Sequence, residues 1–495
     1  MPLASKGVIY IVIDSFHPRA LRHCREKGKL PALSFLIERG HLDESCISIF
    51  PTVTPSCTST LATGDHPAQH GIPGMVWYHR GERRIICYGA NWLSILKSGV
   101  YQSSMDFFFN LNHKHLGWDV RTIYEDLESQ GITTAAANPF IYRGNDEYDA
   151  KIPLSIKLTT LFELDKGKIH GPKKLCLGQL HQPPGNLDLV TEDVRYWKNF
   201  GINDKVSVAA ATWFLQQDER PDLLTIYFPD TDSVAHSENA DCCEPCLTNV
   251  DKHLSKILDC FDSWEQALEE YVFVLVGDHA QSTLEKGKRA FIKIPEILKQ
   301  YSQARLGENP VEGKDIAICS NARTAYIYIL QHRQGMRKDI MKKLLAEPNI
   351  DQVIWKDEAW YHVAKAGKEM LSFSRGNDAG DDYGNKWTLR GDLGCLDMGI
   401  MDGAIKYGCY PNALERITGC LDNPNAGDMI VTAEPGYILG GEGGAFKVKI
   451  GNHGSLHRED SLVPLIISGT PQGIERPRLV DVVPFVKSLL LTPQV

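Results

Sequence analysis

The sequence predicts an α/β fold: a doubly wound, mostly parallel central sheet with flanking helices and an inserted cap subdomain. Continuous apolar runs rich in β-branched residues are typical of strands covered on both faces, and they occur at residues 7–13, 223–228, 271–276 and 462–467. Segments with helical periodicity lie between and after these runs, at residues 31–39, 120–130, 205–217, 247–268 and 479–491. Strands that alternate with helices form βαβ units, which build a parallel sheet.

Two stretches interrupt this alternation. Residues 76–117 are rich in Tyr, Trp, Phe and His without clear periodicity, and residues 301–445 contain a strand and a helix of their own. We therefore expect a core formed by residues 1–300 and 446–495, with an inserted cap or substrate subdomain over residues 301–445. The aromatic side chains of the first stretch could stack a nucleobase, although simple packing is the commoner role.

Composition limits the function classes. The chain has 495 residues, 43% of them hydrophobic, and 53 basic against 62 acidic side chains give a formal charge of −9. These values exclude wholesale disorder and argue against a nucleic-acid scaffold, which needs a basic face. No stretch reaches the roughly 20 apolar residues of a membrane span. The sequence carries no pattern that predicts an oligomeric state.

The start of the chain and the cysteines predict a cytoplasmic location. The first apolar run ends at Asp14 without a cleavage site, so it is a first strand rather than a signal peptide. The 13 cysteines are scattered, and we expect them to be reduced thiols. The cluster Cys242-Cys243-x-x-Cys246 lacks a second CxxC pair, so we assign no zinc site to it.

Acidic and histidine side chains follow the predicted strands where the strands end. The carboxyl ends of parallel strands face the ligand crevice. Each residue alone is most often a helix cap, a turn or an ordinary packed side chain. Together they form a mixed set of carboxylates and imidazoles that suits two divalent ions, with zinc as the first choice and manganese as the alternative. The candidate ligands are Asp14, Asp232, His236, Asp278, His279 and His453.

Thr54 is the candidate nucleophile. It stands before Pro55 in the segment FPTVTPSCTSTLATG (50–64). Proline is favoured as the first residue inside a helix and threonine as the N-cap before it, so we expect Thr54 at a helix N-terminus, where an anion such as phosphate is favoured. A divalent ion on the hydroxyl would lower its pKa and create a nucleophile. Without the metal ligands, Thr54 would be a plain capping residue.

Five segments resemble, in order, motifs of the alkaline phosphatase superfamily, and most closely its nucleotide pyrophosphatase/phosphodiesterase branch. They span nearly the whole chain and comprise IDSF around Asp14, FPTVTPSCTSTLATGDHPAQHGI (50–72), FPDTDSVAH (228–236), VGDHA (276–280) and GNHGS (451–455). The resemblance implies in-line attack by the threonine on phosphorus, two ions that clamp the attacking and leaving oxygens, and hydrolysis of a phospho-threonine intermediate by water. It implies one ion held by Asp232, His236 and His453, and another held by Asp14, Asp278, His279 and Thr54.

The chain departs from the family pattern at one position. Diesterases of this branch usually carry an asparagine about 21 residues after the nucleophile, where its amide binds a phosphate oxygen; this chain has Met75, which cannot donate that bond. Phosphonoacetate-type hydrolases share the threonine and the metal ligands but supply lysines after the strand that here reads ITTAAAN (132–138). In this chain Arg143 is the cation that follows. Met75 and Arg143 are therefore candidate substrate contacts, with a surface arginine in a turn as the alternative for Arg143.

The expected protein is a metal-dependent hydrolase of phosphodiester or pyrophosphate bonds that acts on a small phosphate-ester or phosphonate substrate. A phosphonate hydrolase or a phosphomonoesterase of the same superfamily remains an alternative, as does a metal-binding module without catalysis. Sulfatases need a cysteine or serine in a CxPxR-like context, which the residues after Cys57 do not provide. Cofactor-independent mutases typically use a serine nucleophile.

Overall fold

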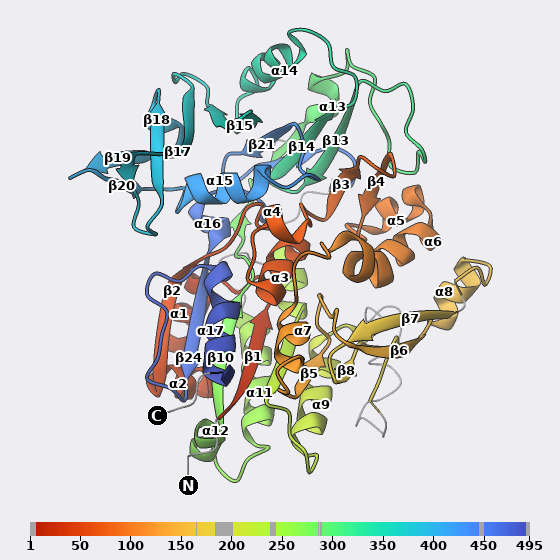
Figure 1. Ribbon diagram of the computed structural model, residues 1–495, viewed down its shortest axis with the longest axis vertical. Helices are drawn as coiled ribbons and strands as arrows, with labels where there is room; N and C mark the ends of the chain where they lie inside the picture. Colours follow the sequence, from red (N-terminus) through yellow and green to blue (C-terminus); the bar gives the residue numbers. More distant parts are fainter. Residues whose placement is uncertain are drawn as a thin grey trace.

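The protein is described here by a computed structural model that covers residues 6–164, 166–183, 201–237, 244–285, 287, 290–444 and 450–491. Two β-sheets dominate it, the first in the lower half of Figure 1 and the second above it. The architecture is a mixed α/β fold with a large central sheet.

The central sheet has seven strands among the described residues, in the order β2-β24-β10-β1-β9-β5-β8. Five neighbouring strands run parallel, from β10 to β8, with Gly7 of β1 opposite Tyr271 of β10. The strands of this sheet are β1 (Gly7–Ile13), β2 (Gly40–Ile47), β5 (Thr134–Ala137), β8 (Lys174–Cys176), β9 (Leu223–Phe228), β10 (Tyr271–Gly277) and β24 (Leu462–Ser468).

The strand expected at residues 462–467 does not join the parallel set. As β24 it pairs antiparallel with β10, with Val276 opposite Leu465. The chain enters β24 a few residues after His453, at the edge where β10 ends, so the strand has to run back in the opposite direction. Its apolar pattern predicted a covered strand correctly but carried no signal of direction.

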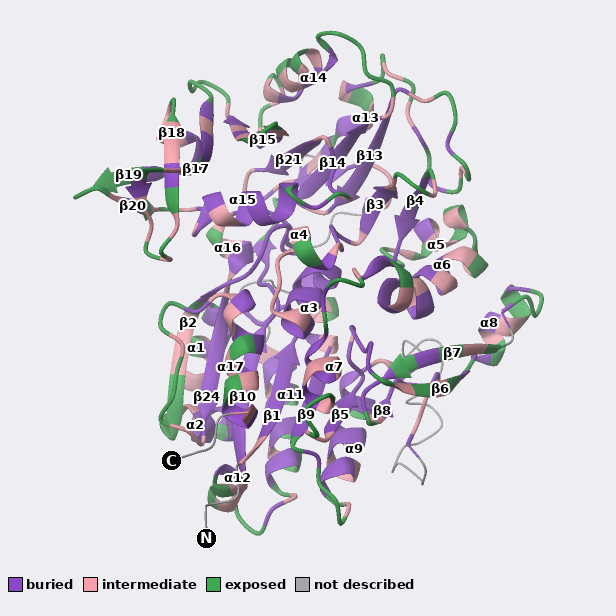
Figure 2. Ribbon diagram, in the orientation of Figure 1, coloured by how far each residue is buried: buried purple, intermediate pink, exposed green. Residues whose placement is uncertain are grey.

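Helices cover both faces of the central sheet, which is why its strands are apolar on both sides. Ile9, Ile11 and Ile13 of β1 share one buried cluster with α1 (Pro18–Glu26), α2 (Pro31–Glu38), α9 (Asp204–Leu215) and α11 (Glu244–Leu258). The alternate residues Val8, Tyr10 and Val12 share another cluster with α3 (Thr54–Thr63), α7 (Ile123–Glu128) and α17 (Leu479–Leu491). Figure 2 shows β1, β9, β10 and β24 as almost entirely buried, whereas most of the edge strand β2 is exposed or half-buried.

The single helix expected at residues 247–268 is two helices. After α11 ends at Leu258, α12 (Trp264–Glu270) starts anew with Ser263 as its N-cap, because the Ser263 hydroxyl accepts a hydrogen bond from the Gln266 amide. The closing helix agrees with its expected limits, and Pro484 lies inside it.

The second sheet is built from strands between residues 316 and 433. It has nine strands among the described residues, and its central part runs β13-β14-β21-β15-β16-β17, where β16 is Trp360–Ala364 and β17 is Leu371–Gly380. These pairings are antiparallel. The elements used below are β13 (Ile316–Asn321), β14 (Thr324–Ile329), α14 (Met336–Leu345), β15 (Ile350–Asp357), α15 (Ala413–Leu421) and β21 (Met429–Ala433).

The aromatic stretch forms the hairpin β3 (Val76–His79) and β4 (Arg84–Cys87), followed by α5 (Trp92–Ser98), α6 (Val100–Met105) and the π-helix η1 (Asp106–His115). Trp77 and Tyr78 are buried in the cluster that also contains residues of the second sheet. Trp92 and Tyr101 are exposed. The buried aromatic residues therefore act as packing residues.

The described cysteines are free thiols with one exception. Cys246 is disulfide-bonded, so the expectation of reduced thiols throughout is wrong at this position. The scatter of the cysteines provides no signal for it, and Cys242 and Cys243 lie outside the described residues. Within the described residues, no helix combines the length and apolar character that a membrane crossing requires.

Candidate metal centre

The structure brings the six expected ligand residues together as two groups of three. Asp14 directly follows β1, Asp278 and His279 directly follow β10, and their ligand atoms lie within 4.8 Å of one another. The other group meets the same limit and combines α10 (Asp230–Ser237), which follows β9, with the turn after β23 (Gly451–Asn452); its members are Asp232, His236 and His453.

Each of the three histidines directs Nδ1 at a main-chain carbonyl. The distances are 2.7 Å from His236 to Gly451 O, 2.7 Å from His453 to Thr52 O and 3.3 Å from His279 to Ala280 O. Because a carbonyl only accepts, Nδ1 carries a proton, and in the neutral imidazole this leaves the lone pair on Nε2. Histidines that ligate metals are usually oriented by a bond of this kind.

The carboxylates show which oxygens are left for a cation. Asp14 accepts a hydrogen bond from the Tyr227 hydroxyl at Oδ2 (2.5 Å), and Asp278 accepts at Oδ1 from the amides of Ser15 (3.0 Å) and His279 (2.7 Å). The other oxygens, Asp14 Oδ1 and Asp278 Oδ2, are buried without a hydrogen-bond partner. Each lies 3.6 Å from His279 Nε2. Unpaired buried oxygens are costly, and a divalent ion bound by these three atoms would satisfy them, so the residues fit a metal.

The electrostatics of this group also favour a cation. Burial, followed by repulsion from Asp278 and Asp232, raises the pKa of Asp14. Burial raises the pKa of Asp278 as well. Burial and the neighbouring His453, whose ring stacks on that of His279 at 3.8 Å between centroids, lower the pKa of His279. His279 is therefore neutral, and a cation would relieve the repulsion between the carboxylates.

Thr54 lies beside this group. Its Oγ1 is 3.2 Å from His279 Nε2, and the residue is buried as the first residue of α3. The N-cap of α3 is Val53, so the expected capping position of Thr54 is wrong by one residue. Pro55 still stands in the first turn, where its missing N–H costs no hydrogen bond.

Two residues whose side chains contact candidate ligands were not predicted from the sequence. Tyr227, the fifth residue of β9, holds Asp14 as described above, and Gln281 donates from Nε2 to Asp232 Oδ1 at 2.6 Å. Gln281 stands two residues after His279, so its place in the VGDHAQ segment is a usable signal. Tyr227 reads as an ordinary strand residue, and only the pairing of β9 with β1 brings it to Asp14.

Met75 is half-buried, and its main chain is bound by an asparagine from the second sheet. Asn321 accepts at Oδ1 from the amides of Met75 (2.8 Å) and Val76 (3.1 Å) and donates from Nδ2 to Val76 O (2.8 Å). Met75 and Asn321 are 246 positions apart, so this contact could not be predicted from the sequence. The Asn321 amide is thus engaged with the peptide backbone at the position where the family asparagine was expected.

Arg143, the other candidate substrate contact, is buried, and its guanidinium is bound within the protein. Its side chain is only 2% exposed. It donates to the carbonyls of Leu116, Gly117 and Val120, and it pairs with Glu125. Because these partners occupy the guanidinium, Arg143 holds the 116–120 segment in place. The alternative of a surface arginine is wrong, because the side chain is buried.

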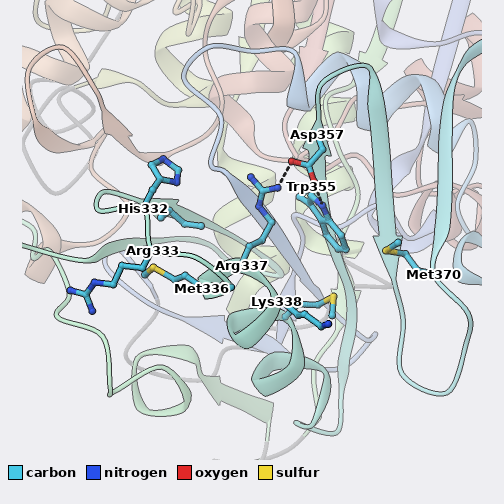
Figure 3. Close-up of a pocket in the computed structure, with 11 residues that line it drawn as sticks. His332, Arg333, Met336, Arg337, Lys338, Trp355, Asp357 and Met370 are labelled. Atoms are coloured by element: carbon cyan, nitrogen blue, oxygen red, sulfur yellow. Dashed lines mark hydrogen bonds and ion pairs between the residues drawn. The ribbon is translucent and has the colours of Figure 1, made fainter.

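A hollow of about 510 Å³ lies elsewhere, on the second sheet between α14 and β15 (Figure 3). Trp355 and Met336 contribute to its lining, and Arg337 pairs there with Asp357. None of the candidate ligands lines it. It is therefore separate from the metal centre.

Known proteins resemble the chain in family and in fold. A family model described as type I phosphodiesterase / nucleotide pyrophosphatase matches residues 8–456. A comparison with curated proteins finds no significant match.

Solved structures share the fold at low sequence identity. Murine ectonucleotide pyrophosphatase / phosphodiesterase 5 is 14% identical with a TM-score of 0.58, over 99% of this chain and 96% of that one. An inactive form of the murine protein in complex with AMP has a TM-score of 0.57 at 14% identity and the same coverage. Phosphonoacetate hydrolase from Sinorhizobium meliloti 1021, in complex with phosphonoacetate, is 16% identical with a TM-score of 0.59, over 99% of this chain and 97% of that one. Since the family model covers most of the sequence, the chain belongs to the type I phosphodiesterase / nucleotide pyrophosphatase family.

Proposed function

We propose that the protein is a two-metal hydrolase that cleaves phosphodiester or pyrophosphate bonds through a phospho-threonine intermediate on Thr54. The observation that carries this proposal is the buried Thr54 hydroxyl, 3.2 Å from Nε2 of His279, which itself lies 3.6 Å from each of two unpaired carboxylate oxygens. A hydroxyl in that position has the surroundings of an activated nucleophile.

Two divalent ions, zinc or manganese, would be held by the two ligand groups, with Thr54 as a further ligand of the Asp14 group. When bound, such ions supply Lewis-acid charge that lowers the pKa of hydroxyl groups and neutralises phosphate oxygens. The pattern of imidazole and carboxylate ligands supports zinc or manganese over a hard, all-oxygen ion.

Residues of the chain orient the substrate anion, the Thr54 hydroxyl and the candidate ligands. The start of α3 favours an anionic group near Thr54, because the positive end of the helix dipole lies there. His279 Nε2 and the Thr54 hydroxyl lie 3.2 Å apart, so one ion could bind both atoms. Tyr227 and Gln281 fix Asp14 and Asp232 by hydrogen bonds, which holds the ligand atoms in place before substrate arrives.

We further propose that residues 1–300 and 446–495 form a doubly wound catalytic core and that residues 301–445 form the cap. The covered faces of the central sheet and the continuous second sheet support this division. The contact between Asn321 and the main chain of Met75 supports a cap that reaches the substrate side of the core.

The substrate class is a small phosphate ester. The structures that share the fold include complexes with AMP and with phosphonoacetate, so the fold itself is compatible with both classes. The engagement of Arg143 with the 116–120 segment supports a diester or pyrophosphate, because phosphonoacetate-type hydrolases supply cations after this strand and here the guanidinium of Arg143 is bound by main-chain carbonyls.

A panel of three substrates tests this proposal. Bis-nitrophenyl phosphate, nitrophenyl phosphate and phosphonoacetate are compared with wild-type protein and Thr54→Ala, each with zinc or manganese added. We expect metal-dependent turnover of the diester that Thr54→Ala abolishes. Turnover of the monoester or phosphonate alone would move the protein to a neighbouring activity. Bound metal without any turnover would favour the non-catalytic module.

A further inference from the structure

Two loops carry three of the proposed ligands and have to keep a fixed distance from each other. The loop of residues 278–282 after β10 carries Asp278 and His279, and the turn of residues 452–455 carries His453. The stacked rings of His279 and His453 show how closely the loops approach.

A fully buried ion pair joins these two loops. Arg323 Nη1 lies 2.5 Å from Asp460 Oδ1, and both side chains are 0% exposed. The same nitrogen donates to the hydroxyl of Ser282 at 2.8 Å. The second oxygen of Asp460 accepts from the amide (2.9 Å) and the hydroxyl (2.8 Å) of Ser455. The ion pair thus binds Ser282 and Ser455, the last residues of the two loops that carry the proposed ligands.

The main chain of the pair reaches the ligands more directly. The Arg323 amide donates to the carbonyl of His453 at 2.9 Å. The Ala280 amide, next to His279, donates to the carbonyl of Asp460 at 2.9 Å. Each member of the ion pair is therefore bonded to a ligand residue or to its neighbour.

Arg323 comes from the turn between β13 and β14 of the second sheet, and this turn packs directly on the His453 turn. A Cβ atom at Gly454 would lie 2.5 Å from the carbonyl oxygen of Asn321, and the φ of Gly454 is +120°. Thr324 Oγ1 also donates to the Gly454 carbonyl at 2.6 Å. Only glycine fits at position 454, between His453 and the second sheet, so the turn of residues 452–455 is in close contact with the turn between β13 and β14.

We infer that Arg323 is a positioning residue, which with Asp460 holds the 278–282 and 452–455 loops so that both proposed ions are bound. This inference rests on the proposed metal centre. It gives the second sheet a role beyond covering the substrate: it supplies the residue that aligns the ligand loops. A guanidinium suits this role because its planar fork binds Asp460, Ser282 and, from Nη2, the Ala433 carbonyl at 3.1 Å. Lysine offers a single nitrogen.

The test compares Arg323→Lys with a matched control, Arg416→Lys. Arg416 is a buried arginine of α15 that donates to Leu456 O, Ile49 O and Ser461 Oγ, none of which lies in a ligand loop. Asp460→Asn is a second test variant, in case one exchange prevents folding. Full-length, metal-stripped proteins are titrated with zinc alone against a chromophoric chelator, and unfolding midpoints are measured in denaturant.

We expect wild type to bind two zinc ions and Arg323→Lys to bind at least one of them about 10- to 100-fold more weakly, as is typical when a supporting contact of a metal ligand is lost. The zinc affinity of Arg416→Lys should stay within about 2-fold of the wild-type affinity, even if its unfolding midpoint falls as much as that of Arg323→Lys. With bis-nitrophenyl phosphate, Arg323→Lys should lose kcat at low zinc and regain it as zinc is raised.

Unchanged zinc affinity in Arg323→Lys and Asp460→Asn would overturn the inference, as would an equal loss in Arg416→Lys. Since zinc affinity needs no substrate, two bound ions without turnover would overturn the proposed function and leave the inference standing. Fewer than two ions in wild type would overturn both.

Discussion

Tyr227 donates a 2.5 Å hydrogen bond to one oxygen of Asp14, and the other oxygen of Asp14 is buried without a partner. The tyrosine thus fixes the carboxylate so that the unpaired oxygen faces His279. Tyr227→Phe should weaken zinc binding about 10-fold or more, because the carboxylate is freed to turn. Tyr10→Phe is the matched control, since Tyr10 is also buried and its hydroxyl donates to the carbonyl of Leu61. Equal zinc affinity in the two variants, measured by chelator competition, would show that the bond does not orient Asp14.

Substituting Met75 tests what replaces the family asparagine. Met75→Asn should raise kcat/KM for bis-nitrophenyl phosphate, because it restores an amide that can bind a phosphate oxygen. Met75→Leu, which keeps the size and adds no donor, should leave kcat/KM within about 2-fold. A fall in Met75→Asn with no change in Met75→Leu would indicate a pocket rebuilt around an apolar side chain.

Arg143 should matter for stability and not for substrate binding. Arg143→Met leaves Glu125 and three carbonyls without their partner and should lower the free energy of unfolding by about 3 kcal/mol. Denaturant unfolding measures this loss, and KM of the folded variant should stay close to the wild-type value. A KM raised tenfold at unchanged stability would return Arg143 to the substrate site.

The free energy of unfolding should fall in mild acid because His70 takes up a proton on unfolding. Burial, and then the neighbouring His66, lower the pKa of His70 from 6.5 to about 3. The unfolded chain binds a proton below about pH 6.5 and the folded chain does not, so this contribution is complete above pH 6.5 and is lost as the pH falls toward 3. The loss approaches about 1.4 kcal/mol for each pH unit in that range.

Denaturant midpoints at pH 7 and pH 5 measure this effect. His70→Asn should have a smaller difference between the two pH values than wild type, whereas His41→Asn, a change at an exposed strand residue, should retain the wild-type difference. An equal difference in His70→Asn and wild type would exclude His70 as the cause.

The grouping of the six candidate ligands could be predicted from the sequence, because they stand at or shortly after the ends of strands. Asp14 and Asp278 stand at the ends of β1 and β10, whose parallel pairing brings them together. Tyr227, Asn321 and Arg323 could not be predicted in the same way. Their roles depend on contacts with residues 213, 246 and 137 positions away, and no local pattern reports such contacts.

The direction of β24 and the contacts of Arg143 could not be predicted from the sequence, for the same reason. Apolar composition reports that a strand is covered but not which way it runs, and a cation after a strand reports charge but not its partner. The antiparallel pairing of β24 with β10 and the carbonyl contacts of Arg143 are both set by tertiary packing. The sequence therefore predicts candidate site residues best where these residues follow the ends of strands.

The most direct test of the proposed mechanism is the search for phosphate on Thr54 during turnover of bis-nitrophenyl phosphate. Reactions are quenched in acid within milliseconds to seconds, and the peptide that contains residue 54 is examined by mass spectrometry. Thr54→Ala is compared with Thr63→Ala, a control in the same helix whose hydroxyl donates to the carbonyl of Ser59. We expect a phosphorylated Thr54 peptide in wild type and Thr63→Ala and neither phosphate nor turnover in Thr54→Ala. Full turnover by Thr54→Ala would contradict the mechanism.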